Sequence, residues 1–169
     1  METRNLELDE THEMQLTLAA ELDQAQVETR FRGKHWREAA VDYFRAQRAA
    51  GRAEMERLMK AAGIAPPAST EQARLLLDGA TRIYLGIEPG DASIERRDGG
   101  VLVLEVRDCP VYQRLLGKAR GITACSCFAR RAGWYEAIGE DLWDEQETNL
   151  KWGDPYCSVT IHLPVSTAA

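Results

Sequence analysis

The first third of the chain carries the hydrophobic spacing of helices. Apolar residues recur there at intervals of three and four, and few residues that break helices interrupt them. A second helix is expected from about His35 to Ala62, because Gly63 supplies a typical stop and Pro66-Pro67 makes a rigid break. Ser69 or Thr70 then caps a third helix, which continues to about Tyr84.

After Pro89-Gly90 the hydrophobic period changes from 3.6 to 2. Two alternating segments, Ala92 to Arg97 and Val101 to Arg107, flank the turn residues Asp98-Gly99-Gly100. This arrangement is typical of a β-hairpin. A helix from about Val111 to Ala119 is expected next, because proline is tolerated in a first helical turn.

The last third of the chain predicts more helix and then a second hairpin. Residues 124–143 favour one or two helices, interrupted near Gly133 or Gly139. The second hairpin pairs residues 147–152 with residues 157–163 around a turn at residues 153–156. The two hairpins together predict an α+β fold with one four-stranded antiparallel sheet and helices packed against it.

The N-terminal helical segment, residues 1–67, is expected to be an arm or a layer on this sheet. Residues 68–169 would then form the ligand-binding or catalytic part, and both would belong to one compact unit. As an arm, the N-terminal helices would offer a contact for a homodimer.

Composition excludes several classes of function. The chain has 169 residues and a formal net charge of −6, which argues against nucleic acid as a partner, since phosphate binding needs clustered Lys and Arg. The N-terminus lacks a secretory signal pattern, and no apolar run is long enough to predict a membrane span. We therefore expect a cytoplasmic protein whose thiols stay reduced.

Four cysteines, Cys109, Cys125, Cys127 and Cys157, carry the candidate chemistry. They come from three separate segments, so they would make one site if these segments converge. In a reducing compartment they favour catalysis, metal binding or redox sensing over structural bridges. Cysteine is also among the most buried residue types, so each of the four could equally fill the core.

Two short strings give the chain a resemblance to a known family: Cys109-Pro110, and Gly153-Asp154-Pro155-Tyr156-Cys157 before the last strand. With the order of elements around them, they resemble the L-2-amino-thiazoline-4-carboxylic acid hydrolase family and, more distantly, small-molecule-binding domains of the 4-vinyl reductase type. The resemblance covers roughly residues 91–164. It implies a small α+β domain with a pocket between helices and sheet, and in the hydrolases the cleavage of a sulfur-containing five-membered ring.

The expected reaction is hydrolysis or elimination at a C–N or C–S bond through a cysteine thiolate. Cys125 and Cys127 are the first candidates for the nucleophile, because a helix start and nearby cations favour a thiolate. Arg130 and Arg131 could bind a substrate carboxylate. Further candidates for substrate binding are Trp134 and Tyr156, and conceivable bases are Glu136, Asp141 and His162.

A second interpretation is a non-catalytic ligand-binding or sensor domain. Zinc prefers four soft or borderline ligands in a tetrahedron, and Cys109, Cys125, Cys127 and Cys157 would supply four thiolates. The sequence thus predicts either no cofactor or zinc, and a small molecule as substrate or ligand.

Overall fold

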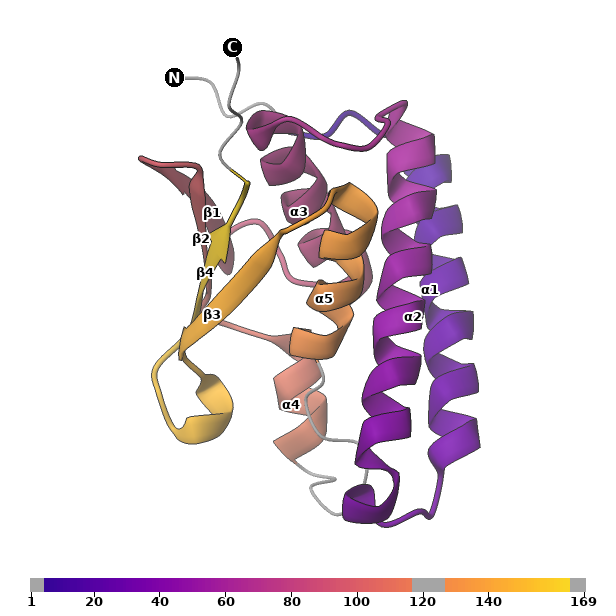
Figure 1. Cartoon of the computed structure of the whole chain (residues 1–169). Helices are drawn as coiled ribbons and strands as arrows, with labels where there is room; N and C mark the ends of the chain where they lie inside the picture. The colour runs from indigo at the N-terminus through magenta and orange to yellow at the C-terminus, as the bar shows by residue number, and fades with distance from the viewer. Residues whose placement is uncertain (1–4, 117–126, 165–169) are drawn as a thin grey trace.

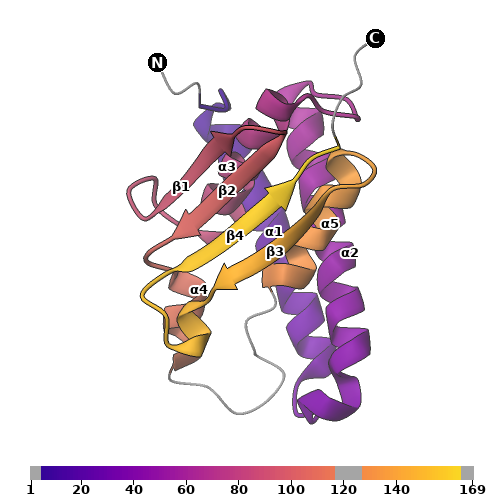
Figure 2. The ribbon, with the colours of Figure 1, turned by 60° about the vertical axis from the view of Figure 1, so that its left-hand side comes forward.

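The computed structural model describes residues 5–116 and 127–164, which form a layer of helices on a four-stranded antiparallel sheet (Figure 1). The helices cover one face of the sheet, and its other face is open (Figure 2). This arrangement confirms the expected α+β class. The N-terminal helices are part of the helical layer and pack directly on the rest of the chain.

Three long helices begin the chain: α1 (Glu10–Phe31), α2 (Trp36–Ala62) and α3 (Thr70–Leu85). As expected, α2 ends at Gly63, whose φ of 66° is a left-handed conformation that glycine adopts at little cost. The cap of α3 is Ser69, which accepts a hydrogen bond from the backbone of Gln72 while the Gln72 side chain accepts one from Ser69 N–H. None of the described helices is both long and apolar enough to cross a membrane.

The sheet has the strand order β1-β2-β4-β3. Its strands are β1 (Ala92–Arg97), β2 (Val101–Val106), β3 (Trp143–Thr148) and β4 (Cys157–His162). The first hairpin, β1 with β2, is the one that the sequence predicts. In the two central strands Leu102 pairs with Ile161 and Leu104 with Val159, and all four side chains are buried in the main core beneath the helices.

The later elements correct the sequence prediction. After α4 (Pro110–Leu116), the helix α5 (Cys127–Ile138) runs through Gly133 without interruption and ends before residue 143. The strand expected over residues 147–152 is wrong: β3 covers residues 143–148, and Leu150–Trp152 forms a short 3-10 helix, η1. The error has a physical cause, because β3 is an edge strand whose exposed side chains include Glu145 and Glu147. Charged edges protect sheets from association and remove the apolar alternation on which the prediction depends.

The helical layer is closed by a backbone-to-backbone crossing of α2 and α5. A Cβ atom added at Gly133 would lie 2.6 Å from the backbone nitrogen of Arg52 and closer still to the carbonyl oxygen of Arg48. A Cβ at Gly51 would lie 2.9 Å from the carbonyl carbon of Arg130. Only glycine at both positions lets the two helices approach so closely, so α2 of the N-terminal segment packs directly on α5 of the C-terminal part.

Candidate functional site

The start of β4, the start of α5 and the residues before α4 lie toward the same end of the sheet (Figures 1 and 2), and each of them carries one of the described cysteines. Cys157 is the first residue of β4 and pairs with Val106 at the end of β2. Cys109 follows Val106 by three residues, a reach of at most about 10 Å. Cys127 begins α5 and, like the other two, packs against the main core. The fourth candidate, Cys125, lies outside the described residues.

The environments of Cys109 and Cys157 suit structural roles. Cys109 is buried just before α4. The Cys157 sulfur accepts a hydrogen bond from the backbone of Leu150 at 3.4 Å and lies 3.8 Å from the amide oxygen of Asn149. These contacts brace the connection that leads from β3 through η1 to β4. Tyr156, a predicted ligand-binding side chain, is half-buried in the same connection.

Cys127 has a different setting, because a buried cation lies one helical turn after it. Arg131 donates to a carboxylate oxygen of Asp144 at 2.7 Å and to the side-chain oxygen of Gln146 at 3.2 Å. Tyr135 donates its hydroxyl proton to the same Asp144 oxygen at 2.7 Å. Residues four apart on a helix share one face, so Cys127 and Arg131 belong to one side of α5.

The electrostatics of this cluster follow from its burial. Burial by itself would lower the pKa of Arg131, but attraction to Tyr135, Asp144 and Cys127 outweighs it, and the pKa lies above its usual range. Burial also raises the pKa of the Tyr135 phenol, and the nearby Asp144 adds to the rise against the opposing effect of Arg131. The Arg131 guanidinium therefore stays charged beside the carboxylate of Asp144, and the Tyr135 phenol stays protonated.

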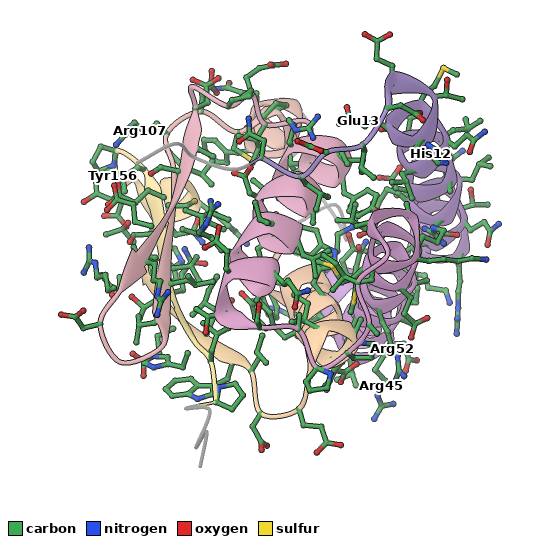
Figure 3. All side chains as sticks on the ribbon, turned by 90° about the horizontal axis from the view of Figure 1, so that it is seen from above. His12, Glu13, Arg45, Arg52, Arg107 and Tyr156 are labelled. Carbon is green, nitrogen blue, oxygen red and sulfur yellow. The ribbon has the colours of Figure 1, made fainter. Side chains whose placement is uncertain are left out.

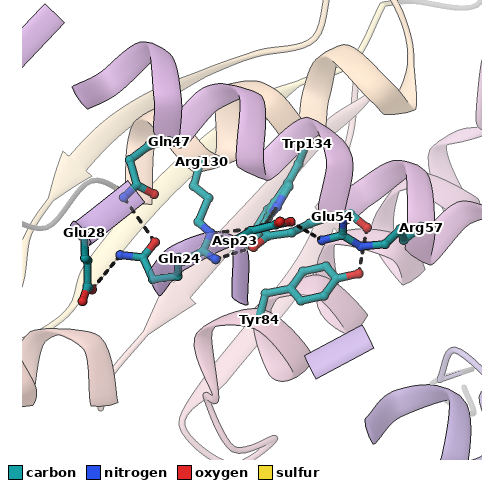
Figure 4. Close-up of polar contacts among 9 residues, drawn as sticks. All are labelled: Asp23, Gln24, Glu28, Gln47, Glu54, Arg57, Tyr84, Arg130 and Trp134. Carbon is teal, nitrogen blue, oxygen red and sulfur yellow. Dashed lines mark hydrogen bonds and ion pairs between the residues drawn. The ribbon is translucent and has the colours of Figure 1, made fainter. Parts of the chain in front are cut away.

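The neighbouring Arg130 takes part in a buried polar network between α5 and α2 (Figure 4). Its Nε lies 3.0 Å from both carboxylate oxygens of Glu54, a side chain with no exposed area, and its terminal nitrogen donates to one of them. Trp134 donates its indole N–H to Glu54 at 2.9 Å. The Tyr84 hydroxyl donates to the backbone carbonyl of Glu54 at 2.7 Å.

This network assigns Arg130 and Trp134 to the core. Because Glu54 already occupies the guanidinium of Arg130, a substrate carboxylate could bind there only by displacing it. Arg131 is committed to Asp144 in the same way. The fixed fork that makes arginine suitable for a substrate carboxylate thus binds carboxylates of the chain itself at both positions.

The candidate bases lie away from the cysteines. Glu136 forms an ion pair with Arg48 of α2 and is about 13 Å along α5 from Cys127. Asp141 is exposed in the turn before β3, where it has a φ of 66°. His162 stacks on Trp143 with ring centroids 3.9 Å apart, at the opposite end of β4, about 17 Å from Cys157.

A zinc site does not follow from the thiols that the structure describes. Within residues 5–116 and 127–164, no three His, Cys, Asp or Glu side chains group as metal ligands. A tetrahedral site needs four such groups in contact with one ion. Cys109, Cys127 and Cys157 therefore do not form the arrangement that a structural zinc requires.

Comparison with known proteins supports the fold alone. No protein-family model matches the chain, and no curated protein matches it by sequence. A solved structure, the trafficking protein particle complex subunit 3 from Naegleria fowleri covalently bound to palmitic acid, superposes with a TM-score of 0.55. The alignment covers 91% of this chain and 95% of that one at 12% sequence identity. The two chains share an architecture over almost their whole length.

Glu54 is the residue that sequence reasoning missed. On α2, the positions Tyr43, Gln47, Glu54 and Leu58 follow the spacing of one core-facing stripe, and all four are buried. A carboxylate on such a stripe is expensive unless a cation and donors meet it. The place of Glu54 on this buried stripe is the signal in the sequence, and it predicts that a cation such as Arg130 is buried beside it.

Proposed function

We propose that this chain is a non-catalytic ligand-binding domain that holds a fatty acyl ligand through a thiol at the cysteine-bearing end of the sheet. The observation that carries the proposal is the buried cation Arg131 one helical turn after Cys127. Cys127 begins a helix with Arg131 one turn on, whereas Glu136, Asp141 and His162 lie elsewhere. A helix start and a cation one turn along favour the thiolate that attacks an acyl carbon.

The acyl class is suggested by the protein with the same fold. That subunit is covalently bound to palmitic acid. In our proposal the Cys127 thiol first gives its proton to solvent, and the thiolate attacks the carbonyl carbon of an acyl thioester. The C–S bond to the donor then breaks, the donor leaves as a thiolate that takes up a proton from water, and a protein thioester results. In this proposal the protein thioester is the end point, and water does not hydrolyse it.

The test is intact-protein mass spectrometry after incubation with palmitoyl-coenzyme A. We expect one palmitoyl group for each chain, released by hydroxylamine, together with one equivalent of free coenzyme A and no free palmitate. Cys127→Ser should abolish the adduct, and the matched variants Cys109→Ser and Cys157→Ser should retain it. A wild-type protein that stays unmodified refutes the acyl proposal, and an adduct retained by Cys127→Ser refutes the assignment to that thiol.

A thiol-dependent hydrolase is the second candidate, favoured by the charge of Arg131 beside Cys127. Its probe is 2-amino-thiazoline-4-carboxylate, and its product is the ring-opened compound that gains one water molecule. Turnover that disappears in Cys127→Ser and persists in Cys157→Ser would replace the binding proposal with this one. Stoichiometric zinc in the reduced protein, with all thiols protected from thiol reagents, would replace both proposals with a zinc-binding domain.

We further propose that the domain works in the cytoplasm, where its thiols stay reduced, and that it forms a homodimer through its N-terminal helices. The dimer proposal concerns a surface remote from the cysteines and does not depend on the acyl ligand.

A further inference from the structure

Helix α1 is apolar on two opposite faces. Its inner face carries Leu16, Ala20 and Val27, which are buried. Its outer face carries Met14, Leu18 and Leu22, which keep 66%, 56% and 57% of their area exposed. A helix that covers a core normally has one apolar stripe and a polar opposite face, so this second stripe needs its own explanation.

The outer stripe is continuous and uncharged. Met14, Leu18 and Leu22 follow one another at intervals of four residues, which places them on the same side of the helix. The exposed residues Thr11 and Ala25 extend this side toward both ends of α1 without adding charge. In two views α1 is the outermost helix, with no described element on its outer side (Figures 1 and 3).

The two borders of the stripe differ in charge. At 100° for each residue, Glu21 and Glu28 lie along one border, and Gln15 and Gln26 lie along the other. All four side chains are exposed. A partner helix that lies on the stripe therefore meets carboxylates on one side and amides on the other.

We propose that the stripe of Met14, Leu18 and Leu22 binds the same stripe of a second copy, with the two α1 helices parallel about a two-fold axis along them. In this orientation the acidic border of each copy faces the amide border of its partner, and an amide can donate hydrogen bonds to a carboxylate. In the antiparallel orientation the two acidic borders would face each other and repel. The charge pattern thus selects both the partner and its direction, and it deepens the homodimer proposed above.

The area of the stripe sets the expected strength of the dimer. Three side chains from each copy, each about 60% exposed, cover roughly 400 Å² of apolar area. A stable interface buries about 1,200–2,000 Å² in total, so the amide and acidic borders must also be covered. A contact of this kind predicts a dimer that dissociates at micromolar concentration.

The first test is sedimentation of the full chain across about 1 to 100 µM, the range in which such a dimer would dissociate. We expect a monomer–dimer equilibrium whose dissociation constant rises at least roughly tenfold in Leu18→Glu. The matched control is Val41→Glu on α2, because Val41 is 64% exposed and lies off the stripe. Unchanged circular dichroism and melting temperature will show that both variants fold.

Each outcome decides between the proposals. A wild-type chain that stays monomeric over this range refutes the homodimer and the stripe together. A dimer that persists in Leu18→Glu, or that Val41→Glu disrupts equally, shows that the stripe is not the dimer interface. The chain would then still self-associate, but through another surface. Neither result bears on the palmitoyl adduct.

The orientation has its own test, which uses single cysteines placed on the stripe. In the parallel dimer, Met14→Cys should cross-link to itself and Leu22→Cys to itself, as read from the linked peptides. The antiparallel dimer would instead link residue 14 of one copy to residue 22 of the other in a mixture of the two variants. That second pattern refutes the parallel arrangement.

Discussion

The crossing of α2 and α5 predicts that Gly133→Ala destabilises the protein, although alanine is the better helix former. A Cβ atom at this position would lie 2.6 Å from the backbone nitrogen of Arg52, whereas Cβ atoms in proteins essentially never come within 3.0 Å of such atoms. The neighbours are backbone atoms of Arg48 and Arg52, so no side chain can turn away. Relief requires the two helices to separate.

The magnitude is the balance of two effects. Alanine in place of glycine inside a helix contributes about 1 kcal/mol of stability. Overpacking costs about 1–3 kcal/mol and more where the backbone must move, as here. Separation of the helices also stretches the bonds from Glu54 to Arg130 and Trp134, which adds to the cost. We expect a net loss of about 2–3 kcal/mol and a melting temperature lower by about 5–10 °C.

Denaturant unfolding followed by circular dichroism and tryptophan fluorescence measures this loss. The matched control is Gly79→Ala inside α3, where an added Cβ would meet side chains rather than backbone: Leu6 at 3.0 Å and Leu58 at 3.7 Å. We expect this control to stay within about 1 kcal/mol of the wild type, because Leu6 can move. A Gly133→Ala protein as stable as the control would refute the close crossing of α2 and α5.

Other predictions concern the buried charges and phenols. Glu54→Ala leaves the Arg130 charge buried, and we expect the free energy of unfolding to fall by about 3–5 kcal/mol; Glu56→Ala, which breaks an exposed ion pair, should cost less than about 1 kcal/mol. Equal losses in the two variants would contradict the buried network. Burial raises the pKa of Tyr135, and burial and the nearby Glu54 raise that of Tyr84, so the folded state keeps both phenol protons where the unfolded chain loses them. Above about pH 10 each tyrosine should therefore lower the stability by about 1.4 kcal/mol for each pH unit. In Tyr135→Phe this alkaline decline should be shallower, and an unchanged slope would contradict the raised pKa.

The sequence predicted those parts of the fold whose signals are local. The stop of α2 at Gly63, the cap of α3 and the hairpin around Gly99 depend on residues next to one another, and all appear in the structure. Strand β3 was missed because its pattern reflects its place at a sheet edge, which only the tertiary arrangement fixes.

The candidate site shows the same limit. The sequence showed that Arg130 and Arg131 follow a cysteine, but it could not show which carboxylates they bind. Glu54 is remote in sequence from Arg130, and Asp144 lies on β3, a strand that the sequence prediction begins four residues too late. From the sequence alone, both arginines therefore remain candidate ligands of a substrate carboxylate. Cys109, Cys127 and Cys157 lie toward one end of the sheet because of the strand order, which the sequence does not show.

The adjacent arginines of α5 make this helix a mechanical link between the two layers of the molecule. Consecutive residues on a helix point about 100° apart, so Arg130 and Arg131 reach in different directions from one turn. Arg130 anchors the turn to α2 through Glu54, and Arg131 anchors it to β3 through Asp144. α5 can therefore neither rotate about its axis nor slide along it without breaking a buried ion pair. A displacement of α5 would therefore be transmitted to α2 in the helical layer and to β3 at the sheet edge at once.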